Sequence, residues 1–209
     1  MASTRDKILD AALRLFARDG FEAVSTSAIA GELGMTKGAL YKHFPDKRAI
    51  FDSLVEEMLE RHKAAGAGFG LAVGSTDEKA RAYAAVTPER MADLGEALFR
   101  RWTQDDDAAS FRHLLTIERF RDERAAAVYD ELFVGGPLRN HEALFTEMVD
   151  IGALRPDDPA QMALDFWAPI HLLMQAVDCG MGIEEATTAA RAHVLSFAAA
   201  HATSNDGAV

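Results

Sequence analysis

The sequence predicts an all-α fold, with a small N-terminal domain followed by a larger helical domain. Apolar residues make up 49% of the 209-residue chain and recur with helical spacing along nearly all of it. Helix-start and helix-stop signals separate these apolar segments. No stretch of four or more residues alternates apolar and polar positions with β-branched enrichment, so we expect no sheet.

The first 50 residues predict three helices and the start of a fourth. The first helix is expected from a cap at Ser3 or Thr4 to the Asp19-Gly20 stop, the second from Thr26 as N-cap to Gly34, and the third from Thr36 as N-cap to Phe44. Pro45 disfavours helical geometry at Phe44, which ends the third helix. Asp46 then begins a helix that carries an apolar stripe to about Lys63.

The glycine-rich stretch GAGFGLAVG, residues 66–74, is the best linker candidate in the chain. Beyond it the sequence predicts helices that start at Ser75 and Thr87-Pro88, one long helix from Asp107 to Gly135-Gly136, and further helices over 137–152, 158–180 and 183–201. We therefore expect four regions: an N-terminal domain over 1–50, a connector helix and linker over 51–74, a helical domain over 75–202, and a disordered tail over 203–209.

Charge is distributed unevenly along the chain. The net charge is -11, which by itself argues against a nucleic-acid partner, yet residues 1–50 hold eight Lys and Arg against six Asp and Glu. This asymmetry favours a nucleic-acid-binding head on an acidic body. The charged N-terminus, the single Cys179 and the absence of an apolar stretch of roughly 18 residues predict a cytoplasmic protein without a membrane partner.

Residues 26–44, TSAIAGELGMTKGALYKHF, carry the strongest functional signal. Ala30 is small enough for two helices to cross closely, Gly34 turns the chain, and Leu40 fills the joint, as a helix-turn-helix requires. The second helix then exposes lysine, tyrosine and histidine side chains and no acidic residue. Such a helix can lie in the major groove, although an ordinary helix hairpin with solvated Lys and His is the alternative.

The segment from Ile8 through Leu54 resembles the DNA-binding domain of the TetR family of transcriptional regulators, most specifically in Gly34-Met35-Thr36, in residues 37–41, in His43-Phe44 and in Asp46-Lys47. Ser27 departs from the family pattern, in which many members carry Arg. The resemblance implies a homodimeric repressor that binds a palindromic operator and is released by a small-molecule effector. The candidate DNA-binding residues are Thr26, Ser27, Thr36, Lys37, Gly38, Tyr41, Lys42, His43 and Lys47.

The effector site is expected in the helical domain. Glu118 lies on the apolar stripe of Phe111 and Leu115, where a carboxylate is unusual; either it selects an effector or it pairs with a neighbouring arginine. With Asp165, it favours a lipophilic cation or amine over a fatty acid. His171 either orients the effector or is a satisfied core histidine. The candidate effector-binding residues are Trp102, Phe111, Leu115, Glu118, Tyr129, Trp167, His171 and Met174.

The last two predicted helices are the expected dimer interface. The helix over 158–180 is apolar nearly all round and so must be covered on two sides. In the final helix, Ala190, Val194 and Phe197 form a stripe that allows close approach of a second copy. We therefore expect a homodimer with a four-helix interface.

The sequence offers no enzyme constellation. GAGFG lacks the G-x-G-x-x-G spacing, there is no G-x-S-x-G motif or P-loop, and the histidines are scattered without metal-ligand spacing. We expect no catalytic residue, no metal and no cofactor. A helical interaction or scaffold protein without specific DNA binding is the alternative function, but it leaves the cation-bearing second helix unexplained.

Overall fold

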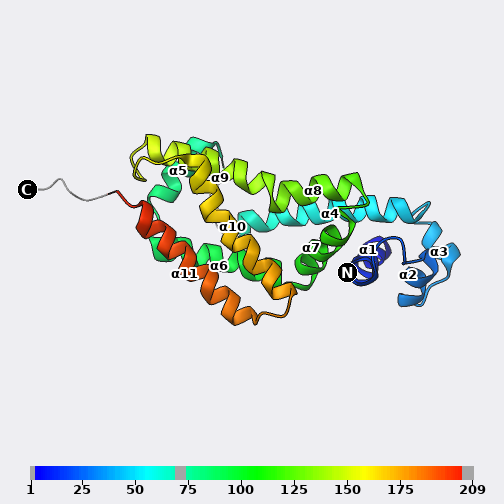
Figure 1. Cartoon of the computed structure of the whole chain (residues 1–209). Coiled ribbons are helices and arrows are strands. Elements are labelled where there is room, and N and C mark those ends of the chain that lie inside the picture. The colour runs from blue at the N-terminus through cyan, green and yellow to red at the C-terminus, as the bar shows by residue number, and fades with distance from the viewer. Residues whose placement is uncertain (1–2, 69–73, 204–209) are drawn as a thin grey trace, which may run out of the picture. The chain divides into compact units, whose positions relative to one another are not determined.

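The computed structural model describes residues 3–68 and 74–203, and within these residues the fold is all-α, which confirms the predicted class (Figure 1). Part of the predicted linker, residues 69–73, and most of the predicted tail, residues 204–209, lie outside the described residues. The helices are α1 (Thr4–Asp19), α2 (Thr26–Glu32), α3 (Lys37–Tyr41), α4 (Lys47–Gly68), α5 (Thr76–Ala84), α6 (Pro88–Gln104), α7 (Asp106–Glu118), α8 (Glu123–Phe133), α9 (Gly135–Asp150), α10 (Pro159–Asp178) and α11 (Ile183–His201).

Side-chain caps fix most helix starts where the sequence predicts them. Ser3 forms a capping box with Asp6 at α1, and the Asp46 carboxylate accepts the Ala49 N–H at 2.7 Å at the start of α4. The cap of α2 is one residue earlier than expected: Ser25, not Thr26, accepts the Ala28 N–H, at 3.0 Å. This shift places Thr26 inside the first turn of α2.

The prediction of one long helix from Asp107 to Gly135-Gly136 is wrong, because this segment forms two helices, α7 and α8, with a break after Glu118. The Glu118 carbonyl accepts the N–H groups of Arg121 and Asp122 at 2.8 and 2.9 Å, which closes α7. The Asp122 carboxylate then accepts the Ala125 N–H at 2.8 Å and starts α8. Gly135 and Gly136 do not stop a helix but form the first turn of α9.

The described chain divides into two compact units that do not follow chain order. Unit 1 combines the residues up to Ala65 with Asp105–Tyr129, and unit 2 combines Gly66–Gln104 with the residues after Tyr129. The segment 105–129, which the sequence groups with the C-terminal domain, therefore packs with the N-terminal helices.

In unit 1, α1 packs against α2 and α7 and buries one apolar face. Its Phe16 ring contacts the rings of Phe21 and Phe51, with centroid distances of 5.4 and 6.3 Å. Phe111 and Leu115 of α7 are fully buried in the same unit. Helix α2 packs against α1 of this core, and α3 packs against α2.

In unit 2, α9 packs along α10, and α11 packs along α6. Phe145 of α9, Phe166 of α10 and Phe197 of α11 stack against one another, with ring centroids 5.0 to 5.7 Å apart. At the α6–α11 contact, a Cβ on Gly95 would lie 3.3 Å from a methyl group of Val194, so the two helices approach closely there.

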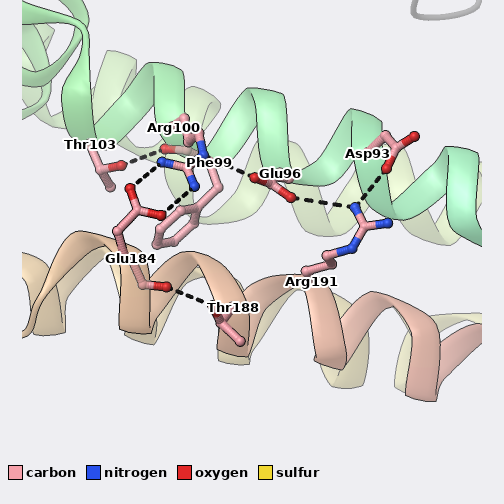
Figure 2. A network of polar contacts seen from close by, with 8 residues as sticks. All are labelled: Asp93, Glu96, Phe99, Arg100, Thr103, Glu184, Thr188 and Arg191. Carbon is pink, nitrogen blue, oxygen red and sulfur yellow. Dashed lines mark hydrogen bonds and ion pairs between the residues drawn. The ribbon is translucent and has the colours of Figure 1, made fainter.

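Ion pairs flank this α6–α11 contact (Figure 2). Arg100 of α6 binds Glu184 of α11 through two hydrogen bonds of 2.8 and 2.7 Å and binds Glu96 of its own helix at 3.0 Å. Arg191 of α11 reaches back to Asp93 and Glu96 of α6, at 2.7 and 3.4 Å. Each arginine in this network therefore holds two carboxylates, and we call these five residues the α6–α11 ladder.

Candidate nucleic-acid interface

Helices α2 and α3 form the predicted helix-turn-helix. The turn between them closes with hydrogen bonds from the Gly34 N–H to the Gly31 carbonyl, at 3.0 Å, and from the Met35 N–H to the Ala30 carbonyl, at 2.9 Å. Gly34 has a φ of 63°, in the left-handed region that favours glycine. Ala30 and Leu40 are buried at the joint, with exposed fractions of 2% and 0%.

The second helix of this motif presents two lysines to solvent. Lys37 and Lys42 are exposed, and within the described part of the chain no carboxylate lies at ion-pair distance from either. The Lys37 ammonium lies 5.6 Å from the centroid of the Tyr41 ring, and Tyr41 is itself 42% exposed. His43 is exposed one residue beyond Lys42. Two cations, a phenol and an imidazole are thus exposed within seven consecutive residues, and a phosphate backbone would complement such a segment.

The candidate DNA-binding residues with small side chains have different surroundings. Ser27 is exposed, and a Cβ on Gly38 would meet nothing within 4 Å, so the backbone of Gly38 is open to close approach. The Thr36 hydroxyl accepts the Ala39 N–H at 3.2 Å and so acts as the N-cap of α3. Thr26 is only 8% exposed, and its hydroxyl lies 3.3 Å from the Tyr41 hydroxyl. Thr26 therefore orients Tyr41 in this structure.

Lys47, the first residue of α4, is half-buried and already has protein partners. Its ammonium donates to the carbonyls of Phe21 and Glu22 at 2.7 and 3.3 Å and lies 4.3 Å from the centroid of the Phe21 ring. A lysine ammonium has three N–H donors, so one donor remains beyond these two bonds. The sequence did not indicate the two carbonyl contacts, because they depend on the α1–α2 turn coming next to α4.

The arginines of unit 1, unlike these lysines, are mostly paired. Arg61 of α4 contacts Glu57, Asp10 and Asp107 at 2.7, 3.2 and 2.7 Å, which joins α4 to α1 and to the start of α7. Arg48 contacts Asp52 and Asp122. Partial burial favours the neutral form of Asp122, but hydrogen bonds from Arg48 and the Ala125 N–H hold the pKa of this carboxyl below its usual value.

Glu118 lies in unit 1 and has a backbone partner. Its side chain is 2% exposed, and its carboxylate accepts the Phe21 N–H at 2.8 Å. Neither alternative weighed from the sequence anticipated this contact, since Phe21 is 97 residues away along the chain. Phe111 and Leu115 are fully buried, and Tyr129 packs under the Arg119 guanidinium at 4.2 Å.

The other candidate effector residues lie in unit 2. Trp102 is 5% exposed and meets the Phe133 ring edge-on at 4.7 Å, and Trp167 donates its indole N–H to the Phe133 carbonyl at 2.8 Å. Met174 is 2% exposed, and His171 is half-buried. The eight candidates are thus divided between the two units, and the effector site stays a prediction.

Two polar residues near these candidates, one of them buried and the other half-buried, were not singled out from the sequence. Arg112 of α7 is 1% exposed, although its spacing of four from Ala108 and three from Leu115 already placed it on the buried stripe. His141 of α9 packs against Phe166 and Trp167, with centroid distances of 4.8 and 5.9 Å, and bonds the Pro137 carbonyl through Nδ1 at 2.7 Å. Burial lowers the pKa of His141, against the opposing effect of that hydrogen bond.

The residues expected at a dimer interface are packed inside unit 2. Ala190 and Val194 are each 3% exposed, and Val194 faces Gly95 of α6. Phe197 belongs to the aromatic stack with Phe145 and Phe166. Their apolar stripe is therefore covered by the protomer itself. The exposed apolar residues of unit 2 include Leu164 and Leu172 of α10, which are 46% and 67% exposed.

Within the described residues, no group of three or more His, Cys, Asp and Glu side chains is arranged to hold a metal ion. A search of the same residues finds no helix with the length and apolar character needed to cross a bilayer.

Residues 8–54 match the family model described as bacterial regulatory proteins, tetR family. Over 71 residues the chain is 38% identical to the HTH-type transcriptional repressor Rv1474c of Mycobacterium tuberculosis, a match that covers 34% of this chain and 38% of that repressor. The chain thus spans less than half the length of this curated relative. The residues matched by the family model, 8–54, include the helix-turn-helix.

Solved structures match nearly the whole chain at low identity. A TetR transcription regulator from Haloarcula marismortui is 16% identical, with a TM-score of 0.69 over 95% of this chain and 98% of that one. A proposed transcriptional regulator from Saccharomonospora viridis, in complex with choline, is 19% identical, with a TM-score of 0.64 over 92% and 94% of the two chains. These likenesses show that the fold is shared.

Proposed function

We propose that this chain, whose residues 8–54 match the model of the tetR family of bacterial regulatory proteins, is a transcriptional regulator that binds operator DNA through α2 and α3. The observation that carries the proposal is the surface of α3, on which Lys37 and Lys42 are exposed without a carboxylate partner among the described residues. Unpaired cations on a helix that follows a tight turn suit phosphate and base-edge contacts in the major groove.

The candidate residues take different roles in this proposal. Lys37 and Lys42 meet phosphates or a guanine edge, and Tyr41 and His43 meet phosphates, while Gly38 allows the backbone to approach. Ser27 and Thr36 lie at the starts of α2 and α3, where hydroxyls suit phosphate oxygens, and Thr26 acts through Tyr41. Lys47 contacts a phosphate of the DNA backbone from the start of α4, where the N-terminal amides of the helix also favour an anion.

The test is selection from a pool of random duplexes at low salt, followed by sequencing. A regulator of this kind enriches palindromes whose half-sites are about one helical turn, roughly 34 to 36 Å, apart. Enrichment of no sequence would favour the scaffold alternative and overturn the proposal. The enriched duplex is then the probe with which DNA binding by variants of this chain is measured.

A homodimer is the proposed assembly, because one α3 helix covers too few base pairs to specify an operator. Leu164, Ala168 and Leu172 follow one another at a spacing of four along α10, and all three are exposed, so they form an apolar stripe on the outer face of unit 2. A second copy that packs the same stripe against this one would bury it symmetrically. We therefore propose this stripe, in place of Ala190 and Val194, as the contact between the two protomers.

Leu172→Glu tests the dimer by placing a charge at the most exposed leucine of the stripe. We expect the parent to sediment as a dimer at micromolar concentration and the variant as a monomer, because a buried unpaired carboxylate is strongly unfavourable. Leu195→Glu is the comparison variant, because it places the same charge on α11 at a leucine that is less exposed than Leu172. A parent that sediments as a monomer would contradict the assembly.

Release of DNA by a small lipophilic effector is the remaining part of the proposal. The preference for a cation rested on Glu118 and Asp165, but Glu118 bonds the Phe21 N–H, and Asp165 is exposed and accepts a hydrogen bond from Gln161. Support for cations now comes from the relative that was solved with choline. Thermal-shift screening of quaternary amines beside fatty acids tests this: stabilisation by fatty acids alone would remove the preference.

A further inference from the structure

We propose that Glu118 is a positioning residue for DNA binding, because its carboxylate holds the peptide group of Phe21 that in turn holds Lys47 at the start of α4. The inference rests on the proposed function, since it concerns the same DNA-binding unit. It assigns Glu118 a role in unit 1 in place of the effector contact expected from the sequence.

The first link runs from α7 to the end of α1. Glu118 is the last residue of α7, is 2% exposed, and accepts the Phe21 N–H at 2.8 Å. Gly20 precedes Phe21 with a φ of 81°, and a Cβ there would lie 3.2 Å from the Glu118 carboxylate. The chain therefore has a glycine where a side chain would be strained and would also crowd the carboxylate.

The second link runs from Phe21 to α4. The Phe21 carbonyl accepts from the Lys47 ammonium at 2.7 Å, so the two polar backbone groups of this residue are held by side chains of opposite charge from different helices. The Phe21 ring is fixed by Phe16 and Phe51, at centroid distances of 5.4 and 5.1 Å, and lies under the same ammonium. Phe21 thus has little freedom to move independently of either charge.

A third contact keeps α7 and α4 in register. Arg48, next to Lys47, pairs with Asp122, which starts α8 just after Glu118. The end of α7 and the start of α8 therefore contact the first two residues of α4, one through Phe21 and the other directly. A displacement of α7 would move the carbonyls that hold Lys47.

The consequence for DNA binding is preorganisation. A lysine side chain has many rotamers, and ordering it on a phosphate costs conformational entropy. Two carbonyls that hold the Lys47 ammonium reduce this cost before DNA arrives and leave one N–H for a phosphate oxygen. Without the Glu118 carboxylate, the Phe21 N–H loses its acceptor and the α1–α2 turn relaxes, which weakens the hold on Lys47.

The experiment is a double-mutant cycle on the selected duplex, with Glu118→Met, Lys47→Met and the double variant. Affinity is measured across a salt series, and thermal unfolding is recorded for each protein. Glu118→Gln keeps an oxygen acceptor for the Phe21 N–H. Glu123→Gln is the matched control, because it removes an exposed carboxylate from the same segment and corrects for the change in net charge.

We expect Glu118→Met to bind about tenfold more weakly than the control and to lose about one unit of salt slope, as Lys47→Met does. The double variant should bind as weakly as Lys47→Met alone, and Glu118→Gln should stay within about threefold of the control. A merely structural role lowers the unfolding midpoint but leaves the salt slope of the folded protein unchanged.

Additive losses in the double variant, or an unchanged salt slope in Glu118→Met, would overturn the inference while leaving the DNA-binding proposal standing. Failure of the parent to enrich any duplex in the selection is a different result, because it removes the proposed function itself.

Discussion

The α3 surface of unit 1 and the α6–α11 ladder of unit 2 use cations in opposite ways. Lys37 and Lys42 are exposed, with no carboxylate at ion-pair distance among the described residues. Arg100 and Arg191 each bind two carboxylates, and the hydrogen bonds that Arg100 donates to Glu184 and Glu96 raise its pKa. This difference in partners is the reason that we propose the α3 surface, and not the ladder, as the one that binds an anion.

Removal of the two unpaired lysines of α3 should have the largest effect on DNA binding. Lys37→Ala with Lys42→Ala should weaken binding of the selected duplex by about a hundredfold near 0.15 M salt and lower the salt slope by about two units, because each lysine that meets a phosphate releases counterions. The unfolding midpoint should not change, since neither lysine has an ion-pair partner to lose.

Lys63→Ala is the matched control for that pair. Lys63 is an exposed lysine of the same unit, but it binds Glu60 at 2.8 Å. We expect the control to retain the parent's affinity and salt slope in a binding titration. The α3 double variant removes two positive charges and Lys63→Ala removes one. Equal losses per charge removed would show that only total charge matters, and the contrast between open and paired cations would fail.

How far the sequence anticipates this contrast depends on the distance between partners along the chain. The helix-turn-helix is a local pattern, and the spacing of Ala30, Gly34 and Leu40 was sufficient to predict its joint and turn. The exposed lysines of α3 follow from the same local periodicity. These features could be predicted because the residues that determine them lie close together along the chain.

Contacts between distant segments were not predictable in the same way. The Glu118 bond to Phe21 and the pairing of Arg100 with Glu184 join residues 97 and 84 positions apart. The sequence identified Glu118 as an unusual carboxylate on an apolar stripe but gave no means of naming its partner. Likewise the stripe of Ala190 and Val194 was correctly read as apolar, yet nothing local showed that α6 covers it.

His141 extends the contrast to a half-buried group of unit 2, with a smaller expected effect. Its pKa is lowered by burial, so the unfolded chain takes up a proton at a higher pH than the folded chain does. Stability is therefore full above about pH 6.5 and falls as the pH drops below the ordinary histidine value, with a slope that approaches about 1.4 kcal/mol per pH unit for one proton.

Urea unfolding of the parent and of His141→Gln between neutral and mildly acidic pH measures this contribution. Gln stays neutral and can still donate to the Pro137 carbonyl, so the variant should lose part of the pH dependence while keeping the hydrogen bond. A variant that is as sensitive to pH as the parent would mean that other groups, and not His141, cause the destabilisation.

Arg100→Gln should have the smallest effect, because the ladder lies at the surface. Glu184, its partner on α11, is 78% exposed, and exposed ion pairs contribute little once solvent and salt screen them. We expect a slight fall in the unfolding midpoint at low salt that disappears at about 0.5 M NaCl, where the screening length is only a few ångströms. Operator affinity should be unchanged in the same variant, although it loses one positive charge as each lysine variant does. A loss of DNA binding comparable to that of Lys37→Ala would show that a paired cation of unit 2 also serves the DNA, and the two surfaces could no longer be separated by their partners.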